Sequence, residues 1–239
     1  MARTLDPVAH AVRREAFLDV AQRLIATKGY TQLSIQDVLD ELGASKGAFY
    51  HYFDSKAALL DGVAARMVEE ATAALVPAVA DPDRSAPDKL NAVFSGLASF
   101  KADRRELILE LMRVWLSDDN AVVREHVRRG AIAAMTPLLA TIIRQGVAEG
   151  SFTAASPDHA GRVVASLALG ANEAATDLFA AHQDGAVTFE EVERTLEAFA
   201  EAFERILGAR PGSLAFANRT GVLREWFDAA TPAGQGGSA

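Results

Sequence analysis

Side chains suited to specific chemistry gather between Ser34 and Lys56, in the run SIQDVLDELGASKGAFYHYFDSK. Gly43 separates two short amphipathic segments there. Ser34 and Ser45 stand where a serine oxygen begins a helix by accepting a backbone N–H. Ser34 and Asp37 also have the spacing of a capping box. Because glycine permits the left-handed backbone of a tight turn, the pattern predicts a helix-turn-helix.

The second of these helices has a surface that suits the major groove of DNA. A helix enters a groove about 12 Å wide only if its leading end is small or polar. Phe49 and Phe53 are expected in the core, where the first helix of the motif packs on them. The side chains left to meet DNA are Ser45, Lys46, Gly47 and Ala48 at the leading end, then Tyr50 and His51.

Flanking residues are suited to holding the DNA backbone. Lys56 lies in the first turn of the next helix, where backbone N–H groups and a cation together bind a phosphate. Tyr30 and Ser34 are candidates for the same role on the other side of the motif.

Helical periodicity dominates the chain, which predicts an all-α fold. A first helix is expected from about Val12 to Lys28, ended by Gly29. Pro137 is expected to kink or split a long helix. After a fourth helix that follows Asp54 and Ser55, helices are expected over about 88–102, 104–116, 120–150, 157–182 and 188–208, with a short one from Leu214 to Phe227.

Composition limits the function. The 239 residues are 50% hydrophobic and include no cysteine, so disulfides and thiolate sites are excluded. With no secretory signal and no run of about 18 apolar residues, a cytoplasmic protein without a membrane partner is expected. The net charge is −8, but residues 1–56 hold seven basic and seven acidic side chains and are neutral.

The run from Phe17 to Leu60 resembles the DNA-binding domain of the TetR family of bacterial repressors. The resemblance rests on Gly29-Tyr30, Ser34-Ile35, Gly43, Ser45-Lys46-Gly47, Phe49-Tyr50, Tyr52-Phe53, Ser55-Lys56 and Leu59-Leu60. It implies that Lys46, Gly47, Tyr50 and His51 face DNA, that Ala48 lies against a thymine methyl, and that Tyr52 and Lys56 touch the backbone. Tyr52 is equally suited to packing. The acidic Asp40-Glu41 departs from the family pattern and makes phosphate contact from that helix less favourable.

The resemblance also implies the domain organisation. Residues 1–65 are expected to form a three-helix helix-turn-helix domain, residues 66–228 a larger helical domain for effector binding and dimerisation, and residues 229–239 a disordered tail. The implied partners are a near-palindromic operator in double-stranded DNA, a second copy of the chain, and a small-molecule effector. The dimer would form through the helices at about 157–182 and 188–208, although their apolar stripes equally suit the core of one subunit.

An apolar or amphipathic effector is expected among the middle helices. The candidate lining residues are Phe94, Leu97, Phe100, Leu111, Met112, Trp115, Met135, Leu139, Asn172, Glu173 and Phe179. Methionine and aromatic side chains at helical spacing suit a plain core as well as a pocket. The polar members suit an exposed face as well as a ligand anchor.

The sequence also bears on two other classes of function. The sequence contains no HExxH, GxSxG, Walker or GxGxxG motif, and its five histidines are scattered, so neither an enzyme nor a metal site is expected. No cofactor is implied. The acidic balance favours the second alternative, a helical ligand-binding protein that does not bind DNA.

Overall fold

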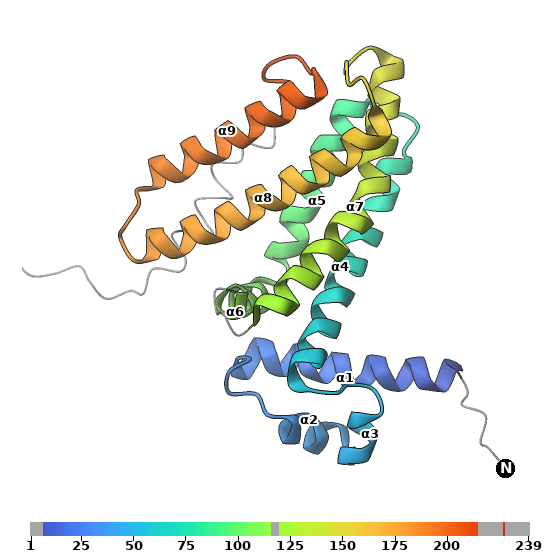
Figure 1. Cartoon of the computed structure of the whole chain (residues 1–239), viewed down its shortest axis with the longest axis vertical. Coiled ribbons are helices and arrows are strands. Elements are labelled where there is room, and N and C mark those ends of the chain that lie inside the picture. Colours follow the sequence, from blue (N-terminus) through green and yellow to red (C-terminus); the bar gives the residue numbers. More distant parts are fainter. Residues whose placement is uncertain (1–6, 116–119, 215–226, 228–239) are drawn as a thin grey trace, which may run out of the picture. The chain divides into compact units, whose positions relative to one another are not determined.

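The computed structural model describes residues 7–115, 120–214 and Phe227, and within them it contains only helices (Figure 1). The helices are α1 Pro7–Lys28, α2 Ile35–Leu42, α3 Lys46–Tyr50, α4 Lys56–Ala80, α5 Ala86–Ala102, α6 Arg105–Trp115, α7 Ala121–Glu149, α8 Pro157–Gln183 and α9 Phe189–Leu207. The all-α prediction is confirmed.

Two details of the helices differ from the sequence prediction. α1 begins at Pro7 rather than near Val12, because proline is well suited to the first helical position even where apolar periodicity is missing. α7 is not split at Pro137 and runs without a break from Ala121 to Glu149. The fully buried Leu139, Ile142 and Ile143 follow that proline, so packing holds the helix together across the lost hydrogen bond.

The first of two compact units lies within residues 1–73 and 98–130. Its core holds Phe17, Leu18, Ile25 and Phe49 together with the apolar face of α6, whose buried residues are Leu107, Leu111 and Val114. The unit therefore reaches beyond residue 65, the expected end of the DNA-binding domain. Periodicity along a helix does not reveal which distant helix covers it.

The second unit lies within residues 74–97 and 131–239. Its core includes Leu90 of α5, Leu139 of α7 and Phe203 of α9. A Cβ at Gly161 of α8 would lie 2.8 Å from the Cβ of Ala140, so glycine there lets α8 approach α7 closely. α8 and α9 lie side by side (Figure 1).

α7 is long and apolar enough by composition to cross a membrane. Its fully buried Leu139, Ile142 and Ile143 lie in the helical core of the second unit.

Most of the predicted helix from Leu214 to Phe227, and the tail at 229–239, fall outside the described residues. Only Leu214 and Phe227 of that segment are described. Leu214 is buried, and the Phe227 ring lies 5.4 Å from the Phe179 ring and 5.8 Å from the Phe189 ring, between centroids.

The start of α2 is stabilised by the predicted capping box. Asp37 donates its backbone N–H to Ser34 Oγ at 3.2 Å, and its carboxylate accepts the Ser34 backbone N–H at 2.7 Å. Lys28 Nζ lies 2.7 Å from the other carboxylate oxygen. The Lys28 ammonium and the two Ser34 donors hold the pKa of Asp37 well below its usual range.

Asp37→Asn should lower the thermal unfolding midpoint near neutral pH. Because the pKa of Asp37 is depressed in the folded state, its contribution is present above the unfolded pKa of about 4 and is lost as the pH falls further. The midpoints of variant and parent should converge on acidification, whereas Asp103→Asn, an exposed site in the same unit, should follow the parent throughout. A gap that stays constant down to about pH 2.5 would contradict the capping account.

Candidate nucleic-acid interface

α3 is a five-residue helix that is held by one side chain and one cap. So short a helix is unstable by itself in water. Phe49 is fully buried, with its ring centroid 5.8 Å from those of Phe17 and Phe53. The Ser45 hydroxyl accepts the backbone N–H of Ala48 at 3.2 Å. Phe49 and Phe53 thus lie in the core, as predicted.

Most other residues of α3, and His51 directly after it, are exposed. Lys46, Gly47 and His51 are exposed, and Tyr50 is 52% exposed. A Cβ built on Gly47 would meet only Ser45 Oγ, at 3.9 Å. Packing therefore does not require glycine there. Because Gly47 has no side chain, a partner can approach the backbone of α3 closely at this position.

Lys56 and Tyr30 meet at the start of α4. Lys56 Nζ lies 4.2 Å from the centroid of the Tyr30 ring and donates to the Thr31 carbonyl at 3.4 Å. Burial lowers the pKa of Lys56, while the nearby Asp37 charge opposes that shift. Burial also raises the pKa of the Tyr30 phenol. The contacts hold this ammonium in a defined position beside the motif.

Two predicted contact residues have structural roles as well. The Ser34 hydroxyl donates to Asp37 Oδ2 at 2.7 Å within the capping box. Tyr52 is half-buried, with its ring centroid 5.6 Å from that of the buried Phe17. Packing thus accounts for part of each residue's surroundings, and their contact with DNA stays a prediction.

His10 is a neighbour of the interface that the sequence analysis missed. Its ring centroid lies 5.3 Å from that of His51 and 4.6 Å from that of Tyr52. It belongs to the part of α1 that the apolar spacing did not predict. The signal that would have found it is Pro7, a residue favoured at the first position of a helix.

The acids of α2 are largely paired. Glu41 forms an ion pair with Arg23 of α1, Asp37 pairs with Lys28, and Asp40 accepts a hydrogen bond from Gln36 at 2.6 Å. These contacts reduce the repulsion that unpaired acids would exert on a phosphate backbone.

Arg66 of α4 connects several elements of the first unit. Its guanidinium lies 3.2 Å from Glu15 and 2.6 Å from Asp19, both on α1, and 3.7 Å from Glu70. Arg104, just before α6, lies 3.4 Å from the same Glu70. Asp19, Arg66, Glu70 and Arg104 line a pocket of about 430 Å³, which thus contains both acidic and basic side chains.

The structure separates the candidate effector residues into groups. Leu111 is buried in the core of the first unit, and Phe100 and Trp115 pack against that core. Met112, in the same unit, is half-buried. In the second unit Leu139 is fully buried, and Phe94, Leu97 and Met135 pack against that core. Farther along α8, Asn172 and Phe179 are half-buried and Glu173 is exposed. Their role in ligand binding stays a prediction.

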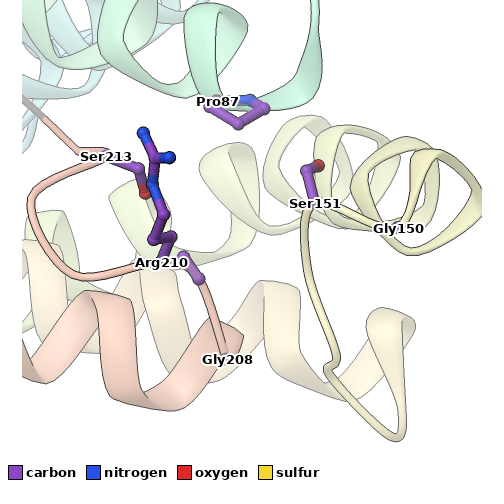
Figure 2. Close-up of a pocket in the computed structure, with 7 residues that line it drawn as sticks. Pro87, Gly150, Ser151, Gly208, Arg210 and Ser213 are labelled. Carbon is purple, nitrogen blue, oxygen red and sulfur yellow. The ribbon is translucent and has the colours of Figure 1, made fainter.

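Other residues line the pocket described in the second unit. This pocket has a volume of about 460 Å³. Figure 2 shows Arg210 and Ser213 on one side of it and Gly150 and Ser151 on the other. Pro87, Gly208 and Ala209 complete its lining. It lies where the ends of α7 and α9 meet the start of α5, and none of the predicted effector residues lines it.

Two family models match the chain. The model described as bacterial regulatory proteins, tetR family, matches residues 17–63, which contain the helix-turn-helix. The model described as tetracyclin repressor-like, C-terminal domain, matches residues 86–192. Together they cover more than half of the chain.

Individual proteins show the same likeness. The HTH-type transcriptional regulator EthR of Mycolicibacterium smegmatis is 29% identical over 144 residues, which are 53% of this chain and 66% of EthR, just under two thirds of that relative. The HTH-type transcriptional repressor KstR2 of Rhodococcus jostii is 25% identical over 157 residues, which cover 62% of this chain and 71% of KstR2.

A solved TetR transcription regulator from Haloarcula marismortui has a similar fold. It superposes with a TM-score of 0.58 at 23% identity, over 80% of this chain and 98% of that one. The family models and the curated relatives are those of transcription regulators and not of enzymes. The chain belongs to the TetR family of bacterial regulatory proteins.

Proposed function

We propose that the protein is a homodimeric repressor that binds a near-palindromic operator through α3 and is released by a small-molecule effector. The observation that carries the proposal is the division of α3 into a buried anchor and an exposed face. Phe49 is fully buried, while Lys46, Gly47 and Tyr50 are exposed. A short helix with this division of its surface fits a major groove.

The proposed contacts fall into two classes. Lys46, Gly47, Ala48, Tyr50 and His51 would meet base edges, with phosphates also in reach of Tyr50 and His51. Ser45 would lie at the leading end of α3 that enters the groove, and Tyr30, Ser34, Tyr52 and Lys56 would hold the DNA backbone. The alternative of a ligand-binding protein without DNA binding rested on the net charge of −8. The pairing of Asp37 and Glu41 with cations of α1 weakens that argument near the motif.

We propose that two copies associate through α8 and α9. One recognition helix reads only a few base pairs, whereas two helices about 34–36 Å apart reach successive major grooves. Val163 of α8 and Ile206 of α9 are 49% and 38% exposed, unusually accessible for large apolar side chains. Both lie toward the end of the helix pair where Thr153 N–H donates to the Leu207 carbonyl at 2.9 Å.

The proposed effector is apolar or amphipathic and binds among the helices of the second unit. Phe94, Leu97 and Met135 are half-buried at the edge of its core, where a ligand can replace solvent at lower cost than in a sealed core. Its binding would favour a conformation with a different spacing of the two recognition helices, with a coupling of about 1–3 kcal/mol. The relative KstR2 is named a repressor, which supports repression rather than activation.

Tyr50→Ala tests the proposed interface. Its affinity for a duplex that the parent protein selects from a random-sequence library should fall about tenfold or more, since such contacts contribute about 1–3 kcal/mol. The unfolding midpoint should stay unchanged because Tyr50 is exposed. Phe49→Ala is the contrasting control and should cost about 3–5 kcal/mol of stability. Unchanged DNA affinity in Tyr50→Ala would count against the interface.

The two lysines should have separable effects. Lys46→Ala should change the preference among duplex sequences, since this side chain is proposed to read a base. Lys56→Gln should weaken all sequences similarly and reduce the slope of log affinity against log salt by about one. Fluorescence anisotropy at several salt concentrations measures both effects. A parental salt slope in Lys56→Gln would remove Lys56 from the list of phosphate contacts.

Val163→Glu should shift the protein from dimer to monomer in sedimentation experiments, because a charge at the proposed interface is costly to bury. Val76→Glu is a matched control on α4, since Val76 is 48% exposed and lies in the same unit. The control should sediment like the parent. A Val163→Glu protein that remains fully dimeric would place the interface elsewhere.

A further inference from the structure

The pocket of about 460 Å³ in the second unit is lined by two tripeptides of the same pattern. One is Gly150-Ser151-Phe152, directly after α7, and the other is Gly212-Ser213-Leu214, after α9. Both glycines have a φ of +75°, in the left-handed region that favours glycine. The apolar residue that ends each tripeptide is buried. Each serine therefore lies between a glycine turn and a buried anchor.

The two anchors are held by specific contacts. A Cβ at Gly146 of α7 would overlap the Phe152 ring, so glycine there lets the ring pack on the helix. Leu214 donates its backbone N–H to the buried Glu204 carboxylate of α9 at 3.0 Å. The walls that carry Ser151 and Ser213 are thus fixed in the free protein, which lowers the cost of ordering them around a ligand.

Two hydrogen-bond donors of the pocket have no partner among the described residues. Ser213 Oγ is buried and makes no hydrogen bond, which is unfavourable for a hydroxyl group. The exposed Arg210 guanidinium forms no ion pair with any residue that the structure describes. The two residues are neighbours, since Ser213 N–H donates to the Arg210 carbonyl at 3.0 Å. Both lie opposite Ser151 (Figure 2), whose hydroxyl already donates to the Gly146 carbonyl at 3.2 Å.

The acids on the segments that form the pocket already accept hydrogen bonds. Asp88 accepts the Ser85 hydroxyl at 2.6 Å, Glu149 accepts the Ala86 N–H at 3.0 Å, and Glu204 accepts the Leu214 N–H at 3.0 Å. None of the three forms an ion pair with Arg210. The unpaired guanidinium therefore favours an anion, and its planar fork matches a carboxylate through two parallel N–H···O bonds.

We propose that this pocket binds a small organic carboxylate through the Arg210 guanidinium and the Ser213 hydroxyl. A single unpaired cation matches a singly charged carboxylate better than a doubly charged phosphate. Pro87 and Ala209 complete the lining and offer apolar surface to a short hydrocarbon body. The site is separate from the proposed apolar effector site and from the proposed DNA interface, so the inference goes beyond the proposed repressor function.

The test titrates the full chain, without DNA, with butyrate, with its neutral amide butyramide and with inorganic phosphate. Butyrate should shift the backbone amide resonances of Gly150, Ser151 and Ser213 in a saturable way, and butyramide should not. Arg210→Gln should weaken butyrate binding about tenfold or more, because hydrogen bonds between charged groups are the strong ones. The matched control Arg194→Gln, at an exposed arginine of α9 that lies 2.7 Å from Glu190, should bind butyrate like the parent.

Ser213→Ala separates a ligand contact from a structural role. Because this hydroxyl has no partner in the free protein, its removal should leave the unfolding midpoint unchanged or raise it, while butyrate affinity falls about fivefold. A lower midpoint with parental butyrate affinity would overturn the assignment of Ser213.

Three other outcomes would overturn the inference: no saturable shift with butyrate, equal shifts with butyramide, or tighter binding of phosphate than of butyrate. None of them bears on the proposed function, because no DNA is present in the titration.

Discussion

The burial of Phe49 is the interaction on which the interface depends. α3 has only five residues, so its own hydrogen bonds cannot hold it in a fixed direction. The Phe49 ring packs against Phe17 and Phe53 and fixes the helix axis relative to α1. The same burial leaves Lys46 and Tyr50 of α3 exposed. The surface proposed to read a DNA groove thus follows from one well-packed aromatic residue and one serine cap.

Because α3 packs on α1, a displacement of α1 would also displace the surface of α3 that is proposed to contact DNA. Arg66 of α4 pairs with two carboxylates of α1, and Glu70 of α4 pairs with Arg104, just before α6. Through these ion pairs α4 connects α1 to the segment before α6. Lys56 ties the start of α4 to the turn before α2. The first unit therefore extends well past the helix-turn-helix itself.

Local features were predictable from the sequence, and long-range packing was not. Ser34, Asp37, Gly43 and Ser45 act within a few residues of their position, so their caps and turn were foreseen. His10 was missed because a surface turn without apolar spacing leaves no periodic signal. The joining of α6 to the core of α1 was also missed, since Leu107 and Leu111 show only that some helix covers them. The sequence did not show which candidate effector residues line a pocket. Residues such as Met135 and Phe94 have the same helical spacing whether they lie in a core or at the edge of a pocket.

Methylation interference tests the central claim most directly, because it reports which base edges in the major groove the protein needs. Guanines of a selected duplex are methylated at N7, and bound and free DNA are compared. The account predicts two clusters of interfering guanines on one face of the duplex, about one helical turn apart, and their loss when Tyr50 is replaced by alanine. Binding that is unaffected by methylation in the major groove would contradict the claim that α3 reads DNA.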